Sequence, residues 1–293
     1  GGSGSSCFTT WTQRGSSLNW NGVAMSSDGT KQIAVTSSSA RVYLSTDSGA
    51  TWTLQGSGPI QPWNGVASSS DGTKLVAITA GAQIYTSTDS GANWTARDSA
   101  RSWRSVASSS DGTKLLAGVN GGTDTLYTST DSGANWTTRD SARNWYSVAS
   151  SSNGTKLVAG DSGGTLYTST DSGVNWTSRG SSGTWYALGS SSDGTKLVAG
   201  SNGGQLYTST DSGANWTARD SNRAWRAAAS SANGNNLIAV VNGGQIYTST
   251  DSGVNWTASD SNRAWRAVTI SPDGTKATAA VSGGYIYTST CPP

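Results

Sequence analysis

One pattern of polar side chains recurs along the chain, and residues 87–95 give it as Ser-Thr-Asp-Ser-Gly-Ala-Asn-Trp-Thr. A carboxylate beside hydroxyl groups is able to bind a metal ion or a sugar. The same residues also suit a turn that folds on itself. An aspartate in a turn accepts hydrogen bonds from the backbone two residues on, and glycine allows a positive φ. The sequence therefore raises two hypotheses for this pattern, a repeated site and a repeated turn.

The sequence lacks two of the side chains that catalytic sites most often use, histidine and glutamate. There is no histidine, and all 17 acidic residues are aspartates. The lack of histidine excludes a Ser-His-Asp triad and a histidine-bound metal. Nearly every aspartate lies at a repeated position, whereas a catalytic site needs different groups that converge on one substrate. We expect a protein that is not an enzyme, with no catalytic residues, no metal site and no cofactor.

Charge and composition exclude other classes of function. The net charge is only +2 and no lysine-rich tract is present, so the basic surface of a nucleic-acid binder is not indicated. No apolar run reaches the roughly 18 residues that a membrane span requires. The composition is rich in serine, threonine and glycine and poor in lysine, which suits a secreted or cell-surface protein.

Tryptophan spacing defines the elements that must position these side chains. The 14 tryptophans form two sets of seven, and each set recurs at intervals of about 40 residues. The members of the first set each precede a threonine: Trp11, Trp52, Trp94, Trp136, Trp176, Trp216 and Trp256. The second set is Trp20, Trp63, Trp103, Trp145, Trp185, Trp225 and Trp265. Two tryptophans per repeat indicate seven repeats, and this period is typical of propellers and solenoids.

One repeat contains four predicted strands. In the repeat that begins at Trp145, the strands are predicted at residues 145–151, 156–160, 165–170 and 176–179. Glycine-rich turns separate them, and the first turn carries an Asn-Gly pair, a strong hairpin signal. Four short strands in about 40 residues match one blade of a β-propeller. We predict an all-β fold, a seven-bladed β-propeller of four-stranded blades.

The two ends of the chain are predicted to complete one blade. Residues 9–14 match the fourth strand of a repeat, and residues 265–290 match its first three strands. A composite last blade closes the ring and leaves no sheet edge exposed. Cys7 and Cys291 fall at adjacent positions of an intact repeat. This predicts a disulfide between them, with two free thiols as the alternative, and a disulfide indicates an oxidising compartment.

The domain prediction follows from the repeats. Residues 1–6 are glycine and serine only, which is typical of a flexible linker. Residues 7–293 are predicted to form a single propeller domain, which we expect to be monomeric.

The pattern Ser-x-Asp-x-Gly-x-x-Trp resembles the Asp-box, or BNR repeat, of sialidase-like propellers. The resemblance implies that the pattern is a structural turn between strands three and four, on the face away from the usual active site. It assigns a structural role to six aspartates: Asp47, Asp89, Asp131, Asp171, Asp211 and Asp251. Sialidases use an arginine cluster, a tyrosine nucleophile assisted by a glutamate, and an aspartic acid. This chain has no glutamate, so that nucleophile pair is not available.

The opposite face carries the better candidates for binding. Loops such as "TARDSNRAW" offer arginine, aspartate and tryptophan, a mixture that binds sugars through an aromatic face and polar partners. The candidate residues are Arg101, Trp103, Arg104, Arg143, Trp145, Arg223, Trp225, Arg226, Arg263, Trp265 and Arg266. Three repeats lack the second arginine of the loop, so we expect about four sites. Several weak, equivalent sites would add through effective concentration.

These observations favour a non-catalytic, multivalent protein with lectin-like carbohydrate binding at the blade boundaries. The same residues allow a purely structural interpretation. The tryptophans would then pack in the core between blades. The arginine–aspartate pairs would form ion pairs that stabilise the loops. The alternative function is a structural or protein-interaction scaffold, a recently amplified or designed propeller with no selected ligand.

Overall fold

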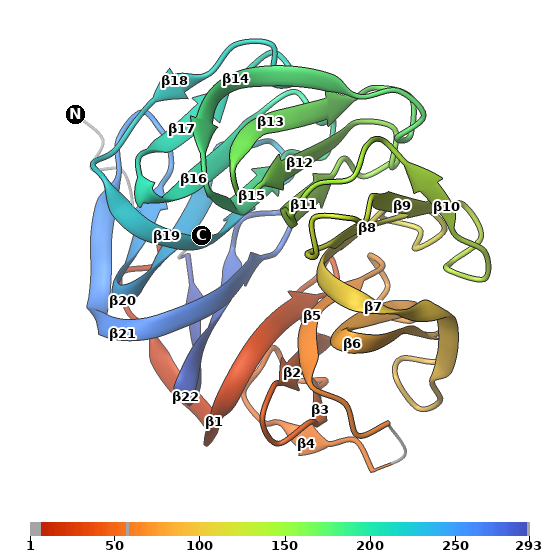
Figure 1. The fold of residues 1–293 in the computed structure, drawn as a ribbon. Coiled ribbons are helices and arrows are strands. Elements are labelled where there is room, and N and C mark those ends of the chain that lie inside the picture. The colour runs from red at the N-terminus through yellow and green to blue at the C-terminus, as the bar shows by residue number, and fades with distance from the viewer. Residues whose placement is uncertain (1–6, 57–58, 292–293) are drawn as a thin grey trace.

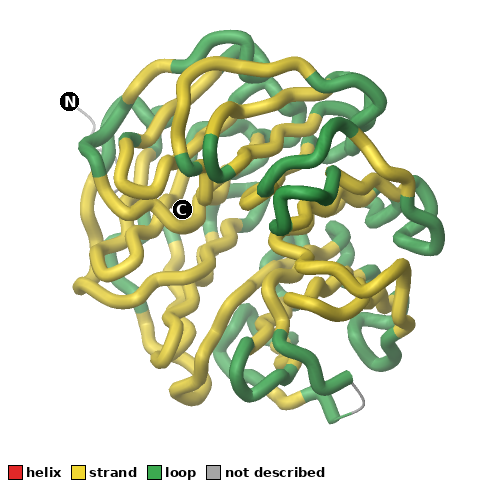
Figure 2. Tube along the Cα trace, in the orientation of Figure 1, coloured by secondary structure: helices red, strands yellow, loops and turns green. Residues whose placement is uncertain are grey.

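The protein is all-β in the computed structural model, which describes residues 7–56 and 59–291. The predicted linker at residues 1–6 lies outside this range. No helix occurs within the described ranges, and therefore none there is long and apolar enough to cross a membrane (Figure 2).

The described residues form 22 strands. The first eleven are β1 (Thr12–Met25), β2 (Gln32–Thr36), β3 (Val42–Ser45), β4 (Thr53–Leu54), β5 (Trp63–Ser68), β6 (Leu75–Ser87), β7 (Thr95–Ser108), β8 (Leu115–Val119), β9 (Leu126–Ser129), β10 (Thr137–Arg139) and β11 (Trp145–Ser150). The others are β12 (Leu157–Asp161), β13 (Gly164–Ser169), β14 (Thr177–Gly183), β15 (Trp185–Ser190), β16 (Leu197–Gly204), β17 (Leu206–Ser209), β18 (Thr217–Ala218), β19 (Arg223–Ser230), β20 (Leu237–Ser249), β21 (Thr257–Ile270) and β22 (Lys276–Thr290).

The repeating unit is an antiparallel four-stranded sheet. Strands β11, β12, β13 and β14 pair in chain order, and they correspond to the four strands predicted from the sequence. In several repeats two predicted strands join into one. Strand β7 pairs with β6 through its first half and with β8 through its second half. A long strand of this kind carries the chain from the outer edge of one sheet to the inner edge of the next.

The sheets are arranged around a central axis, as Figure 1 shows. The innermost strands contact one another in a closed circuit: β1 with β5, β5 with β7, β7 with β11, β11 with β15, β15 with β19, β19 with β21, and β21 with β1. This arrangement is a β-propeller. The prediction of an all-β propeller is therefore confirmed.

The hydrophobic core lies between neighbouring sheets. One cluster joins Val76 and Ile78 of β6 to Leu115 and Ala117 of β8, with Trp103 buried at its centre. All seven tryptophans of the second set are at most 1% exposed. Each stacks edge-on against the tyrosine or equivalent aromatic of its own sheet, and this contact adds to the burial of apolar area.

Segments near the two ends of the chain pair in one sheet. The first residues of β1 pair with β22 in antiparallel register, with Thr12 opposite Thr288. The predicted disulfide between Cys7 and Cys291 is present and joins residues 284 positions apart. The described part of the chain contains no free cysteine.

A buried polar pair distinguishes the boundary where the ends meet. Gln32 of β2 and Thr278 of β22 are at most 3% exposed, and the threonine hydroxyl donates to the glutamine Oε1 at 2.8 Å. At the neighbouring boundary the equivalent residues are Ile33 and Leu75, which pack together in an apolar cluster. Two polar residues therefore replace an apolar contact at this one position.

The Ser-Thr-Asp-Ser-Gly pattern forms a turn that satisfies its own polar groups. In the copy at residues 87–94, Asp89 Oδ1 accepts from the Ser87 hydroxyl at 2.8 Å and from the Asn93 backbone at 2.9 Å. Its Oδ2 accepts from the Asn93 side chain at 2.7 Å. Gly91 has a φ of 87°, where a side chain would be strained, and its carbonyl accepts from Trp94 Nε1. The carboxylate is thus occupied by its own turn.

A second aspartate turn connects the first two strands of a repeat. Asp71 accepts hydrogen bonds from the Ser69 hydroxyl, at 2.6 Å, and from both the backbone and the hydroxyl of Thr73. Asn153 occupies the same position in another repeat and accepts from Ser151 at 2.8 Å. The turn therefore forms with either a charged or a neutral acceptor.

Because of these turns, we expect the free energy of unfolding to fall steeply at acidic pH. Hydrogen bonds from serine, threonine, asparagine and the backbone lower the pKa of nine turn aspartates to about 2. A carboxyl group whose pKa is lower in the folded state stabilises the protein above its unfolded pKa, and this stabilisation is lost as the pH falls. We expect the denaturant midpoint, followed by circular dichroism, to be flat from pH 7 to 5 and to fall steeply between pH 4 and 2.

The matched control is the variant Asp71→Asn, which removes the titratable carboxylate and retains an oxygen acceptor for the turn. Asp71→Asn is expected to lower the free energy of unfolding at pH 7 by about 1 kcal/mol. Asn153 shows that a neutral side chain forms this turn, but hydrogen bonds to a charged acceptor are stronger than those to a neutral one. The variant should lose stability less steeply below pH 4. A midpoint that is independent of pH between 5 and 2 in the unmodified protein would contradict this account of the turns.

Candidate functional site: an arginine-lined pocket on the axis

A pocket lies on the propeller axis at the start of the innermost strands. It has a volume of about 170 Å³ and is open to solvent. One residue from each repeat lines its mouth, the residue that directly follows a tryptophan of the second set. These residues are Asn21, Asn64, Arg104, Tyr146, Tyr186, Arg226 and Arg266. The pocket is therefore shared by all the sheets and lies at no single boundary.

Strand alternation explains why these side chains face the axis. Successive side chains of a strand point to opposite faces. In β7, Trp103 is fully buried among the sheets, whereas the next residue, Arg104, lines the pocket. Two residues further on, Val106 lines the inner part of the same pocket. Trp103 thus packs in the core between sheets, and Arg104 faces the propeller axis.

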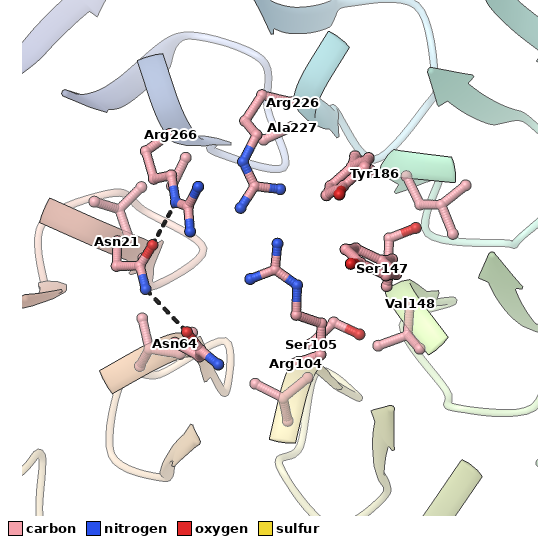
Figure 3. Close-up of a pocket in the computed structure, with 18 of the residues that line it drawn as sticks. Asn21, Asn64, Arg104, Ser105, Ser147, Val148, Tyr186, Arg226, Ala227 and Arg266 are labelled. Carbon is pink, nitrogen blue, oxygen red and sulfur yellow. Dashed lines mark hydrogen bonds between the residues drawn. The ribbon is translucent and has the colours of Figure 1, made fainter. Parts of the chain in front are cut away.

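Three arginines converge at the mouth of this pocket. Figure 3 shows the guanidinium groups of Arg104, Arg226 and Arg266 directed toward a common centre. The tyrosines form one wall, with their ring centroids 4.4 Å apart. The Arg104 guanidinium lies 5.0 Å from the Tyr146 ring, and that of Arg226 lies 4.9 Å from the Tyr186 ring. These cation–π contacts hold the guanidinium groups in place.

The asparagines form the opposite wall and are already hydrogen-bonded. Arg266 Nε donates to Asn21 Oδ1. The Asn21 amide donates to the Trp63 carbonyl at 2.8 Å and to Asn64 Oδ1 at 3.2 Å. The Asn64 amide donates to a backbone carbonyl at 2.7 Å. This wall orients Arg266 and offers few free acceptors.

The pocket holds positive charge without a counter-ion. No carboxylate lines it, and within the described ranges none of the three arginines forms an ion pair. Burial lowers the pKa of all three arginines, and the neighbouring guanidinium groups lower that of Arg226 and Arg266 further. Burial also raises the pKa of Tyr186, so this ring stays neutral at physiological pH. Arg104 Nε is buried with no hydrogen-bond partner.

The structure corrects the sequence prediction for four tryptophans. Trp103, Trp145, Trp225 and Trp265 were expected to offer a ring face to a sugar, but each is 0% exposed. Each is covered by a tyrosine of its own sheet and by the neighbouring sheet. These rings belong to the core and have no face available for a ligand.

The four arginines that precede a tryptophan of the second set by two residues lie apart from the pocket. Arg101 pairs with Asp124 at 3.0 Å, and its guanidinium stacks 4.7 Å from the Tyr127 ring. The other three stack in the same way on a tyrosine, with the nearest carboxylate oxygen 3.4 to 3.9 Å away. They are Arg143, Arg223 and Arg263. Of the predicted set, only Arg104, Arg226 and Arg266 are brought together.

Sequence reasoning missed four of the residues that complete the pocket: Asn21, Asn64, Tyr146 and Tyr186. The signal for them was the residue type at one repeated position. The position after the tryptophan holds asparagine, arginine or tyrosine, so every repeat places a large polar side chain there. No cluster of three or more acidic, histidine or cysteine side chains placed to hold a metal occurs in the described ranges.

Comparisons with known proteins support the fold. No protein-family model matches the sequence, and no curated protein matches it. Among solved structures, YCF48 from Cyanidioschyzon merolae is similar with a TM-score of 0.73 and 16% identity, over 96% of this chain and 98% of that one. A structure of YCF48 bound to D1 peptide gives a TM-score of 0.73 and 18% identity, with 97% of each chain covered.

An enzyme shares the same fold. The GH74 xyloglucanase from Xanthomonas campestris has a TM-score of 0.74 and 19% identity, over 95% of this chain and 53% of the enzyme. This chain therefore spans about half the length of the xyloglucanase. At such low identities, these similarities establish the β-propeller fold alone.

Proposed function

We propose that this protein is a non-catalytic binding protein, and that the pocket on the axis binds an anionic group of its ligand. The observation that carries this proposal is the convergence of Arg104, Arg226 and Arg266 on one small pocket without any carboxylate. Three like charges held together raise the free energy of the unliganded protein. A bound anion would relieve that repulsion, and a partly desolvated site makes the attraction stronger than in water.

The non-catalytic part of the proposal rests on the side chains of the pocket. Its ionisable groups are three arginines and two tyrosines, and the chain contains no histidine or glutamate. General acid–base catalysis most often uses histidine or a carboxyl group within hydrogen-bond reach of the substrate. The pocket offers binding groups instead.

The pocket also narrows the ligand class expected from the sequence. Hydroxyl groups of a neutral sugar need acceptors as well as donors, but the asparagine side chains of the pocket are already bonded to each other and to the backbone. A carbohydrate ligand would therefore carry an acidic group. The second candidate is a protein-interaction role, supported by the propeller YCF48, which has been solved bound to D1 peptide.

We also propose the number of blades, the way the ring closes and the identity of the aspartate turns. We infer seven blades and closure by a composite blade from the circuit of inner strands and from the pairing of β1 with β22. We interpret the aspartate turns as Asp-boxes, because each carboxylate is bonded within its own turn. The disulfide supports a secreted or cell-surface location, and we expect a monomer.

Binding should be lost when the charge of the pocket is removed. We expect the unmodified protein on a mixed array to bind acidic glycans or acidic peptides, and no neutral glycans. The triple variant Arg104→Gln, Arg226→Gln, Arg266→Gln should weaken that binding at least about 100-fold, because each lost charge-assisted hydrogen bond contributes roughly 1.5–3 kcal/mol.

The matched control makes the same change of charge outside the pocket. The variant Arg101→Gln, Arg143→Gln, Arg223→Gln should retain binding, since these arginines stack on tyrosines outside the pocket. Equal losses in both triple variants would show that net charge alone drives binding and would refute the pocket. Turnover of an aryl glycoside by the unmodified protein would refute the non-catalytic assignment.

A further inference from the structure

We propose that the group bound in the axial pocket is a phosphomonoester, a tetrahedral dianion. This inference rests on the proposed function and specifies its ligand. Its basis is the number, direction and hydrogen-bonding capacity of the groups that face the pocket.

The charge of the pocket matches a dianion better than a monoanion. Arg104, Arg226 and Arg266 contribute three positive charges, and the remaining polar side chains at the mouth are neutral. A carboxylate would neutralise one of these charges. A phosphate ester carries about −1.5 to −2 charges at pH 7 and therefore offsets more of the mutual repulsion.

The directions of the three guanidinium groups favour a tetrahedral acceptor. Arg104 extends from β7, Arg226 from β19 and Arg266 from β21, so they approach the centre of the pocket from three different sheets (Figure 3). A carboxylate presents two oxygens in one plane and suits one or two guanidinium forks. A phosphate ester presents three terminal oxygens in three directions, one for each arginine.

The inner surface of the pocket mainly offers donors. Arg104 Nε is buried at the pocket and has no hydrogen-bond partner. Asn21 and Asn64 are already bonded, and the Ser147 hydroxyl donates to the Trp185 carbonyl at 2.8 Å. An ester phosphate accepts hydrogen bonds and donates none, so it would satisfy this unpaired donor.

The lining of the inner part of the pocket indicates how the ligand enters. Aliphatic side chains such as Val23, Val106 and Val148 line its inner part. A second cavity, lined mostly by serines, lies further along the axis near Ser68 and Ser108. Because aliphatic residues separate the two cavities, the pocket receives the end of a ligand, which suits a terminal phosphate on a small molecule.

Isothermal titration calorimetry of the full chain at constant ionic strength tests the proposal. The probes are inorganic phosphate and glucose 6-phosphate, with glucuronate, acetate and glucose for comparison. We expect both phosphates to bind at least about tenfold more tightly than glucuronate or acetate, and glucose to show no binding. Tighter binding of glucose 6-phosphate than of inorganic phosphate supports the ester. Tighter binding of inorganic phosphate would overturn the ester in favour of the free ion.

The pH dependence provides an independent readout. Affinity for glucose 6-phosphate should rise several-fold between pH 5 and 7, because the second proton of the ester leaves near pH 6. Affinity for glucuronate should stay constant there, because a carboxyl group is already ionised. The titratable side chains that face the ligand are Arg104, Arg226, Arg266, Tyr146 and Tyr186, and no carboxylate or histidine lines the pocket. The ligand is thus the one group that titrates in this range.

Single variants locate the bound phosphate. Arg226→Gln should weaken glucose 6-phosphate binding at least about tenfold, and Arg101→Gln, outside the pocket, should leave it unchanged. Phosphate binding that is insensitive to Arg226→Gln would overturn the assignment to this pocket. Glucuronate binding as tight as phosphate would overturn the phosphate inference and leave the anion-binding function intact. No binding of any anion, with acidic ligands on the mixed array also unbound, would overturn both.

Discussion

Replacing Cys7 with serine is expected to lower the free energy of unfolding by about 5 kcal/mol. The bridge to Cys291 closes a loop of nearly the whole chain, with a sequence separation of 284. In the chain-entropy model a cross-link destabilises the unfolded chain, and its effect grows with the logarithm of the loop length. Urea unfolding followed by tryptophan fluorescence would measure the loss.

The control variants distinguish the effect of losing the disulfide from the effect of changing either cysteine side chain. Cys291→Ser and the double serine variant should show the same loss as Cys7→Ser, because each removes one and the same bond. Chemical reduction of the unmodified protein should reproduce it. A loss below about 1 kcal/mol in all of them would show that the pairing of β1 with β22 already closes the ring without the disulfide.

Replacing Trp103 with alanine is expected to lower the free energy of unfolding by about 3–5 kcal/mol, the range for large buried aromatics. The ring is 0% exposed, and it packs edge-on against Tyr127 at 5.0 Å and against Trp136 at 6.2 Å. Its removal leaves a cavity between two sheets. Thermal unfolding by calorimetry would measure the effect.

Trp103→Phe is the control for Trp103→Ala, because it keeps an aromatic ring at the same position. The Trp103 Nε1 atom has no hydrogen-bond partner, so phenylalanine loses apolar area but no hydrogen bond, and we expect less than half the effect of alanine. A Trp103→Ala variant that keeps its stability but loses ligand binding would return this residue to the set of ligand contacts, contrary to its burial.

Most of the fold could be predicted because the repeats carry the same local signals many times. The alternation within residues 145–151 and the Asn153–Gly154 turn define strands and a hairpin without any distant contact. The adjacent repeat positions of Cys7 and Cys291 predicted a disulfide between them, and that disulfide is present. Where neighbouring strands would merge, as in β7, was not predicted, because the bend between sheets depends on packing.

The site was predicted only in part, for a physical reason. Trp103 and Arg104 were assigned to one ligand site because they are adjacent in sequence, but adjacent residues of a strand face opposite sides. The tryptophan is buried between sheets and the arginine lines the pocket. That Arg104 meets Arg226, from a sheet far along the chain, follows from closure of the ring, which no local pattern encodes.

The buried pair of Gln32 and Thr278 has a consequence for assembly. Nearly identical repeats present nearly identical surfaces, so apolar contacts such as Ile33 with Leu75 distinguish poorly between a correct and an incorrect neighbour. Against any other sheet, Gln32 and Thr278 would each lose the bond between them, and an unsatisfied buried polar group costs about 1–3 kcal/mol. The pair therefore favours contact between these two sheets over any other neighbour within the chain, and it disfavours a ring that closes with the wrong number of sheets.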